Sequence, residues 1–298
     1  MNLYGPLTGC TVARYSSNFP LTTLIQYPTQ KPLSTTSNYL ILLGGLSDAL
    51  LPTPYTAPLA AACTLNNFAF VNPTLRSSSL QFGFGSLDDD VADLEDLLSY
   101  LTSLSPTSPS KFVLVGHSTG CQQTVHYLRT SPNAESITGA VLQAPASDRE
   151  TTEDNTQWCE MAETMIRENK ADEFLPRAAF WAPITASRFT SLYSLIADGD
   201  DYFSSDLSDS QLTARLSHIP SLISSSTAAL KFCVAAYSMN DEYVPPSVDK
   251  ESLLSRFESI GGMEVWKLPG VHNLMPSSTY PNSHTDFVAK VEAKLKAL

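Results

Sequence analysis

The segment FVLVGHSTGCQQ, Phe112 to Gln123, places one serine between two glycines directly after a run of apolar residues. The apolar run predicts a buried strand, and the residues after the second glycine predict a helix. GHSTG matches the pattern G-x-S-x-G, in which a tight strand-to-helix turn exposes a nucleophilic serine at the edge of a sheet. We therefore expect Ser118 to be a nucleophile. Gly116 and Gly120 are expected to make the turn sterically possible.

Segments of alternating character surround this motif. Short apolar runs predict buried strands, and amphipathic stretches between them predict helices. Such alternation indicates the α/β class, with a mostly parallel central sheet that is flanked by helices on both faces. The predicted strands are Cys10–Tyr15, Leu21–Tyr27, Tyr39–Gly45, Asn67–Pro73, Lys111–Gly116, Ile137–Pro145, Leu230–Tyr237 and Met263–Gly270.

Two of the predicted helices have a recognisable start. Ser86 and Asp89 stand three residues apart before an apolar-periodic stretch, which predicts a capping box. Ser283 and Asp286 have the same spacing at the start of the last helix and predict a second capping box.

The stretch 147–229 interrupts the alternation, because it contains no convincing strand. Insertions between two sheet strands often cover a site. We therefore predict a single domain over residues 1–298, with residues 147–229 forming a helical cap within it. The insertion is rich in aromatic residues, namely Trp158, Phe174, Phe180, Trp181, Phe189, Tyr193, Tyr202 and Phe203.

A serine nucleophile needs a base, and the base needs a carboxylate that orients it. On a sheet of this type the acid and then the histidine follow the serine, on loops after later strands. Asp241 and His272 occupy these two positions, with Glu242 as the alternative acid. We therefore predict the triad Ser118, Asp241 and His272. The remaining histidines are expected to be structural or exposed: His117, His126, His218 and His284.

Acyl transfer also requires hydrogen-bond donors for the oxyanion, each contributing about 3 kcal/mol. The backbone N–H of Thr119, directly after the nucleophile, is predicted to be one donor. The loop after the strand Tyr39–Gly45 is predicted to supply the other. We expect that donor to be the N–H of Leu46, with Gly45 and Ser47 as alternatives.

Composition excludes several classes of function. The net charge of -12 argues against nucleic-acid binding, which requires a basic surface. The five scattered cysteines never form a CxxC pair, which favours a reducing compartment over a disulfide framework or a zinc site. No apolar run approaches the ~18 residues of a membrane span. We therefore expect a cytoplasmic protein that acts on a small-molecule ester and uses no cofactor, metal, nucleic acid or membrane.

Four further segments are GGLSDA, SLQFGFGSLDDDVADL, APASDRE and PITASRFTSLYSLIADGDDYFSSDLSD. Through them the chain resembles the fungal siderophore esterases that act on fusarinine C, a family within the α/β-hydrolase superfamily. The resemblance covers nearly the whole chain and implies the α/β-hydrolase fold. It also implies a serine esterase that opens the ester bonds of a ferric siderophore, with the iron carried by the substrate.

The resemblance has a consequence for substrate binding, because fusarinine C carries free amino groups that are protonated at neutral pH. An acidic protein offers counter-charge to such a substrate. We expect part of it to come from Asp48, beside the oxyanion loop, and part from the acidic stretch 199–209.

Two other functions fit the same sequence. A broad carboxylesterase, thioesterase or lipase would use the same triad, and the aromatic insertion would suit an apolar acyl chain. A non-catalytic ligand-binding homologue would keep the fold without turnover. The complete set of triad residues favours an enzyme over a binder.

Overall fold

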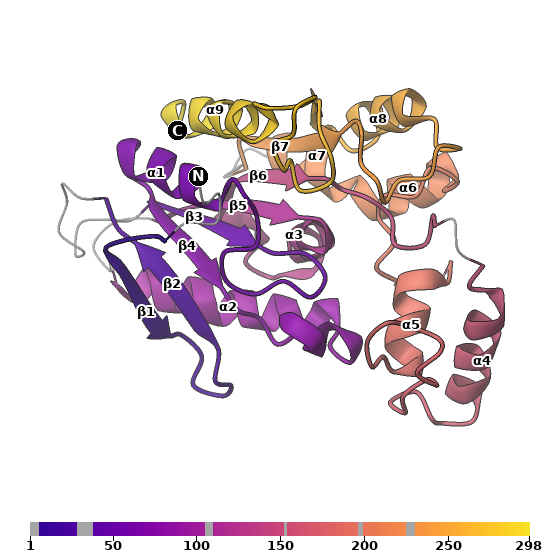
Figure 1. Ribbon diagram of the computed structural model, residues 1–298. Coiled ribbons are helices and arrows are strands. Elements are labelled where there is room, and N and C mark those ends of the chain that lie inside the picture. Colours follow the sequence, from indigo (N-terminus) through magenta and orange to yellow (C-terminus); the bar gives the residue numbers. More distant parts are fainter. Residues whose placement is uncertain (1–5, 29–37, 105–109, 152–153, 196–198, 225–229) are drawn as a thin grey trace.

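An eight-stranded sheet forms the centre of the computed structural model (Figure 1). Its strands follow the order β1-β2-β4-β3-β5-β6-β7-β8. The two pairings at the β1 end are antiparallel, and all pairings from β4 to β8 are parallel. The predicted α/β class with a mostly parallel sheet is therefore confirmed. The structure describes residues 6–28, 38–104, 110–151, 154–195, 199–224 and 230–298.

The observed strands lie where apolar runs predict them. Each of the parallel strands places the side chains at its carboxyl end at the same edge of the sheet, which is where ligands of α/β proteins bind. The strands are β1 (Cys10–Arg14), β2 (Thr22–Gln26), β3 (Asn38–Leu43), β4 (Ala69–Pro73), β5 (Lys111–His117), β6 (Ile137–Gln143), β7 (Phe232–Ser238) and β8 (Glu264–Leu268).

Side chains of the central strands alternate between two apolar cores, one on each face of the sheet. On β5, Phe112 and Leu114 pack into one core, whereas Val113 and Val115 pack into the other. Successive residues of a strand point to opposite faces, so a continuous apolar run is what a strand buried on both faces requires. This is why FVLV forms a central strand.

Helices cover both faces (Figure 1). One core contains residues of α1 (Thr56–Leu65) and α9 (Ser283–Lys296). The other core contains residues of α2 (Leu87–Leu104), α3 (Thr119–Thr130) and α8 (Lys250–Ser259). Two short 3-10 helices, η2 (Ser79–Gly83) and η3 (Ala134–Ser136), complete the connections.

The two predicted capping boxes have different outcomes. At α2, the Ser86 N–H donates to Asp89 Oδ2 at 3.1 Å and the Asp89 N–H donates to Ser86 Oγ at 3.1 Å, which confirms the first. The prediction at Ser283 is wrong, because Asn282 precedes the helix and Ser283 Oγ donates to the Pro269 carbonyl. Ser283 is already the first residue of the helix, and its hydroxyl forms no capping hydrogen bond.

The segment between β6 and β7 contains α4 (Thr156–Arg167), α5 (Ala186–Tyr193), α6 (Asp209–Leu216) and α7 (His218–Ser224). Helices α4 and α5 pack on each other beyond the sheet and have a small apolar core of their own (Figure 1). Helices α6 and α7 instead contribute Leu212, Leu216 and Ile219 to a main core. The insertion therefore consists of two parts, and a cap over the site remains a prediction.

Within the part of the chain that the structure describes, no helix combines the length and the apolarity that a membrane span requires.

Candidate active site

Ser118 stands in the turn between β5 and α3 with φ 53° and ψ -122°. A residue with a side chain rarely adopts this conformation, and such strain concentrates at functional sites. A Cβ atom added to Gly116 would lie 2.3 Å from the Gly120 carbonyl oxygen, and one added to Gly120 would lie 2.6 Å from that of Leu43. Both glycines are therefore required by close backbone approach, as the elbow pattern predicts.

Asp241 and His272 form a buried pair. His272 Nδ1 lies 2.6 Å from Asp241 Oδ2, and the side chains of His272 and Asp241 are 9% and 2% exposed. Asp241 follows β7 and His272 follows β8, so both stand at the carboxyl edge of the sheet. The other oxygen of Asp241 accepts the Tyr243 N–H at 2.9 Å. The carboxylate is thereby held in one orientation toward the imidazole ring.

Glu242, the alternative acid, has a different partner. Its Oε2 accepts the backbone N–H of His272 at 2.8 Å. The ring of His272 is therefore paired with Asp241, whereas its backbone is held by Glu242.

Ser118 shares the sheet edge with this pair, two strands from β7. In the described chain the Ser118 hydroxyl and the His272 ring form no hydrogen bond with each other. In enzymes without substrate such contacts are often long and tighten only in the complex.

The predicted oxyanion loop lies directly against Ser118. A Cβ atom added to Gly45 would lie 2.7 Å from Ser118 Cβ. The Gly45 N–H is engaged, because it donates to Asp48 Oδ2 at 2.7 Å. Across the described residues, the amides of Leu46 and Thr119 have no acceptor. Leu46 and Ser47 therefore remain as sources of the second donor, and Gly45 does not.

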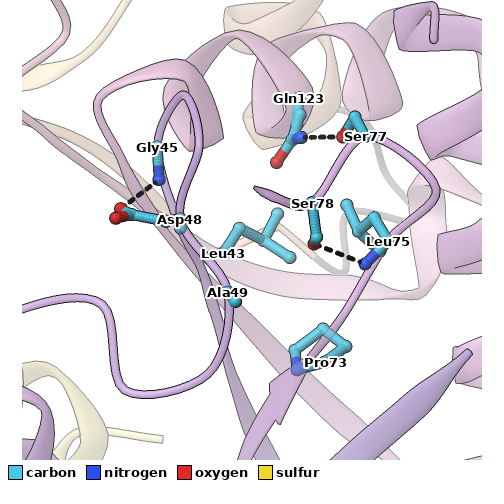
Figure 2. Close-up of a pocket in the computed structure, with 10 residues that line it drawn as sticks. Leu43, Gly45, Asp48, Ala49, Pro73, Leu75, Ser77, Ser78 and Gln123 are labelled. Carbon is cyan, nitrogen blue, oxygen red and sulfur yellow. Dashed lines mark hydrogen bonds between the residues drawn. The ribbon is translucent and has the colours of Figure 1, made fainter. Parts of the chain in front are cut away.

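Asp48 closes the turn of this loop (Figure 2). Besides accepting the Gly45 N–H, it donates its own N–H to the Gly45 carbonyl at 3.0 Å. Burial raises the pKa of the Asp48 carboxyl, while the Gly45 N–H and the nearby His272 act in the opposite direction. One carboxylate oxygen thus orders the loop, and a contact with substrate remains a prediction.

A small cavity adjoins the loop (Figure 2). It measures about 10 Å³, which is enough for one water molecule. Gln123 reaches it from α3 and donates to Ser77 Oγ at 3.2 Å, whereas Gln123 Oε1 has no partner in the described chain. Residues of the loop line one side of the cavity, which is too small for an ester substrate.

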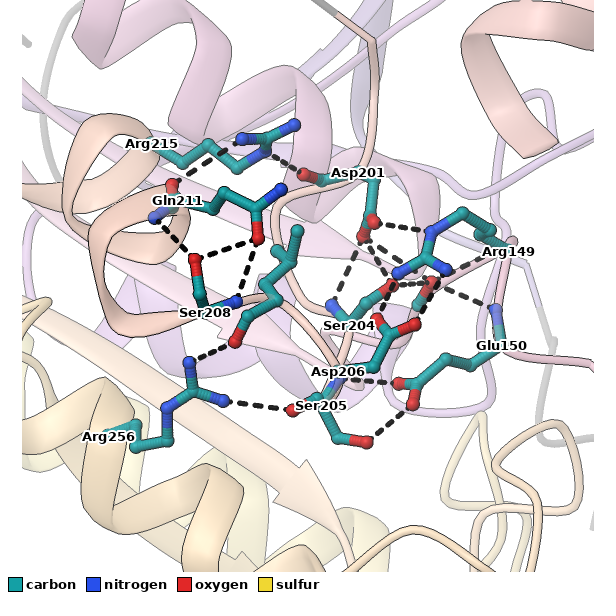
Figure 3. A network of polar contacts seen from close by, with 12 residues as sticks. Arg149, Glu150, Asp201, Ser204, Ser205, Asp206, Ser208, Gln211, Arg215 and Arg256 are labelled. Carbon is teal, nitrogen blue, oxygen red and sulfur yellow. Dashed lines mark hydrogen bonds and ion pairs between the residues drawn. The ribbon is translucent and has the colours of Figure 1, made fainter. Parts of the chain in front are cut away.

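The acidic stretch 199–209 is engaged in ion pairs (Figure 3). Arg149 contacts both Asp201 and Asp206, each at 2.9 Å. The Asp200 carboxylate pairs with the buried Arg188, and Asp209 pairs with Arg256 at 2.9 Å. Each of the four carboxylates thus already has a cationic partner within the protein, with Arg149 shared by two of them. The expectation that this stretch supplies counter-charge to a substrate therefore has no support in its geometry.

Sequence reasoning missed Gln143. This buried residue ends β6, and its amide contacts the His117 side chain and the His272 backbone. The available signal was a polar residue at the carboxyl end of an apolar strand. His117, expected to be structural or exposed, is buried, and its ring lies 5.1 Å from the ring of His272, centroid to centroid. Burial, followed by the proximity of His272, lowers the pKa of His117 to about 3.

Aromatic side chains stand beside the site. The Tyr243 ring packs edge-on against His272 with centroids 4.8 Å apart, and it is 66% exposed. A second group joins η2 to the insertion, with Phe84 against Phe174 at 6.1 Å and Phe82 against Trp181 at 5.4 Å. The η2 helix begins next to the oxyanion loop, because the Ser79 N–H donates to the Asp48 carbonyl at 2.9 Å.

Proteins of related sequence include two fungal relatives. A UPF0613 protein of Schizosaccharomyces pombe is 31% identical over an alignment that covers 83% of this chain and 84% of that protein. The fusarinine C esterase sidJ of Aspergillus fumigatus is 30% identical, with 91% of this chain and 90% of that protein covered.

Among solved structures, the siderophore hydrolase EstB from Aspergillus fumigatus matches with a TM-score of 0.78 and 30% identity, covering 98% of both chains. The resemblance to fungal siderophore esterases is therefore confirmed at the level of the family. Residues 5–296 match the family model described as "Protein of unknown function (DUF1749)". The chain thus belongs to the DUF1749 family, and it is an enzyme with the α/β-hydrolase fold.

Proposed function

We propose that this protein is a serine esterase that hydrolyses the ester bonds of a ferric siderophore of the fusarinine C type. The observation that carries the proposal is the buried 2.6 Å contact between His272 Nδ1 and Asp241 Oδ2 at the sheet edge that holds Ser118. A carboxylate at Nδ1 keeps the proton there and leaves Nε2 as the base. The named activities of sidJ and EstB support the substrate class.

In the proposed reaction, Ser118 Oγ attacks the ester carbonyl carbon while His272 Nε2 takes the hydroxyl proton. The tetrahedral intermediate collapses to an acyl-serine when His272 returns that proton to the leaving alcohol oxygen. Water then attacks the acyl-serine, again with His272 as base, and releases the acid and free Ser118. Asp241 holds the ring and stabilises the imidazolium. The amides of Thr119 and Leu46 donate to the oxyanion.

We assign the part of the insertion that contains α4 and α5 to a cap beside this site. Its connection to the body supports the assignment. The Thr185 N–H donates to the Gly83 carbonyl at 2.8 Å, and Gly83 ends η2, whose first residue Ser79 bonds to Asp48 of the oxyanion loop. A Cβ atom added to Gly83 would lie 1.9 Å from the Pro183 carbonyl oxygen, so the two segments are in direct backbone contact.

The first test is mass-spectrometric detection of linear products from ferric fusarinine C. The wild-type protein and Ser118→Ala are assayed in parallel, with p-nitrophenyl acetate as a second substrate. We expect the wild type to cleave both esters and the variant to cleave neither. A wild type that cleaves only p-nitrophenyl acetate would discard the siderophore substrate and keep the esterase. Cleavage of neither substrate, with tight retention of the siderophore, would favour the non-catalytic binder.

Exposed apolar side chains favour a second substrate class, an ester with an apolar acyl chain. Leu80, Phe84, Phe174 and Trp181 are each more than half exposed although they belong to the contact region of η2 and the insertion. A broad carboxylesterase would use them to bind the chain. Values of kcat/KM for p-nitrophenyl esters of increasing acyl length, compared with that for ferric fusarinine C, separate the two classes.

A variant at Asp48 tests whether the enzyme distinguishes substrates by their charge. Asp48→Asn keeps an oxygen that accepts the Gly45 N–H and removes the negative charge. If Asp48 selects a substrate with free amines, this variant reduces the ratio of kcat/KM for fusarinine C over its N-acetylated form. An unchanged ratio would assign Asp48 to loop order alone.

We also propose a cytoplasmic location, for which the free thiols of all five cysteines provide support. Fractionation of cells that express the protein at its natural level provides the test. Recovery in the culture medium or with membranes would contradict the proposal.

A further inference from the structure

The side chain of Gln143 lies beneath the proposed catalytic residues. Gln143 ends β6 and is fully buried. Its amide has two N–H donors and a carbonyl oxygen that accepts two hydrogen bonds. All four positions are used. Oε1 contacts Tyr55 Oη at 2.9 Å and His117 Nδ1 at 2.7 Å, and Nε2 contacts Ser238 Oγ at 3.1 Å and the His272 carbonyl oxygen at 2.9 Å.

These partners determine the orientation of the amide. The His272 carbonyl oxygen can only accept, so Nε2 must face it and Oε1 must face the opposite side. Because Oε1 only accepts, His117 carries its proton on Nδ1 and is a neutral donor. The Ser238 hydroxyl also donates to the His272 carbonyl, at 3.3 Å. The backbone of His272 is thus held by two donors from neighbouring strands.

The backbone of Gln143 holds the other half of the site. Its carbonyl oxygen accepts the Ser118 N–H at 3.0 Å and the Cys121 thiol at 3.2 Å. Ser118 has the strained conformation of the elbow, so this hydrogen bond is one of the contacts that maintain it. One residue therefore bonds to the backbone of both Ser118 and His272, whose side chains must meet during catalysis.

We propose that Gln143 is a positioning residue, which holds His272 relative to Ser118 and keeps the surroundings of the His272 ring free of additional charge. The proposal rests on the proposed esterase function. An amide is suited to this place because it donates to the His272 carbonyl without carrying a charge. A carboxylate here would repel that carbonyl and stabilise the imidazolium forms of both nearby histidines.

Other titratable groups already face His272 from every element around it. They are present in the wild type and in every Gln143 variant alike, so a difference between these proteins reports on position 143. They are Asp241, Glu242 and Tyr243 after β7, His117 on β5, Asp48 on the oxyanion loop and Asp148 after β6.

The experiment measures kcat and KM for p-nitrophenyl acetate from pH 5 to 9 in the wild type, Gln143→Glu and Gln143→Met. We expect Gln143→Glu to lower kcat at least tenfold with KM within threefold. Its acid limb is expected to move to higher pH by about one unit, because a carboxylate near His272 favours the protonated ring. Gln143→Met, which has similar volume and no charge, is expected to lower kcat without moving the acid limb.

Val141→Ala is the matched control, since Val141 is a buried core residue two positions earlier on β6. We expect it to lower the thermal midpoint and to leave kcat and the pH profile unchanged. Folded Gln143 variants with kcat within threefold of wild type would overturn the proposal. If neither variant folds at 25 °C, Gln143→Asn, whose amide is one methylene shorter and cannot reach the His272 carbonyl, replaces them, and an unchanged kcat in that variant would equally overturn the proposal.

The esterase function itself is checked separately by Ser118→Ala. Equal rates in the wild type and Ser118→Ala would refute the proposed function, whatever the Gln143 variants show. A loss in Ser118→Ala together with normal Gln143 variants would refute only the positioning role.

Discussion

The backbone N–H of His272 donates a hydrogen bond of 2.8 Å to Glu242 Oε2. The ring of the same histidine is bound by Asp241, the neighbour of Glu242 in the sequence, at 2.6 Å. Two adjacent carboxylates therefore serve different parts of one residue. The carboxylate at the ring orients the imidazole and sets its tautomer, whereas the one at the backbone holds the main chain of His272.

This division predicts unequal effects of two conservative substitutions. Asp241→Asn should lower kcat for p-nitrophenyl acetate by about 10⁴-fold, because an amide at Nδ1 favours the wrong tautomer. Glu242→Gln should lower it by less than about tenfold, because the amide oxygen still accepts the His272 N–H. Steady-state kinetics of the two variants provide the measurement. A larger loss in Glu242→Gln would assign the acid of the triad to Glu242.

Gly45 should tolerate no side chain. The methyl group of Gly45→Ala would lie 2.7 Å from Ser118 Cβ and 3.3 Å from Ser118 Oγ, so the nucleophile or the oxyanion loop must shift. We expect kcat/KM to fall by about 10² or more, as misplacement of a reacting group by about 1 Å does. Labelling with a fluorophosphonate probe measures the reactivity of Ser118 independently of turnover.

Gly85→Ala is the control for this variant. The nearest atom to a Cβ at Gly85 is 3.6 Å away, an ordinary contact. We expect wild-type labelling and kinetics in Gly85→Ala. Wild-type labelling in Gly45→Ala as well would show that the loop does not contact the nucleophile in solution.

The depressed pKa of His117, about 3, predicts a pH-dependent stability. Protonation of His117 favours the unfolded chain, where the histidine pKa is about 6.5. The destabilisation is absent above pH 6.5 and grows by about 1.4 kcal/mol per pH unit as the pH falls toward 3. His117→Gln removes the imidazole. The free energy of unfolding of this variant, relative to wild type, should therefore rise as the pH is lowered from 6.5 to 4.5.

The measured quantity is the difference in the free energy of unfolding between His117→Gln and wild type, because Asp90 changes the stability of both proteins in the opposite direction with pH. Burial raises the pKa of Asp90 to about 7, so ionisation of Asp90 destabilises the fold as the pH rises. Urea unfolding of both proteins at pH 4.5, 5.5 and 6.5 gives the difference. A difference that is constant with pH would mean that His117 is protonated in the folded protein.

The Arg149–Asp201 pair should be important for stability. Arg149→Ala leaves the Asp201 carboxylate, which is 1% exposed, without its cation, and we expect a loss of roughly 3 kcal/mol in the free energy of unfolding. Lys170→Ala breaks an exposed pair with Glu168, which solvent screens, and should leave the free energy of unfolding nearly unchanged. Chemical denaturation compares them. Equal losses in both variants would show that the network of Figure 3 is dispensable.

Much of the fold could be predicted from the sequence because its signals are local. The apolar runs indicated all eight strands, and the capping pair Ser86 and Asp89 indicated the start of α2. Helix α1, TAPLAAACTL, was not predicted, because a stretch of small residues with few polar ones has no clear amphipathic period. At Ser283 the local spacing matched a capping box, but the structure contains none at that position. The Ser283 hydroxyl instead donates to the carbonyl of Pro269, which no local pattern predicts.

The role of the acidic stretch could not be predicted. Asp201 and Asp206 are separated by more than fifty residues from Arg149, and no spacing rule relates them. A cluster of acidic residues predicts a negative surface when no basic partners for them are known. The fold brings guanidinium groups to these carboxylates and so offsets part of their negative charge.

The sequence by itself determined the α/β class and the elbow around Ser118. It also determined that an acid and a histidine follow later strands, because strand period and glycine sterics act over a few residues and chain order is read directly from the sequence. Only the tertiary structure decided that Asp241, and not Glu242, holds the His272 ring, and that Gln143 joins the two halves of the site. Those contacts join residues that come together only when β5, β6, β7 and β8 assemble side by side. The energy of a buried hydrogen bond depends on that assembly rather than on any one segment.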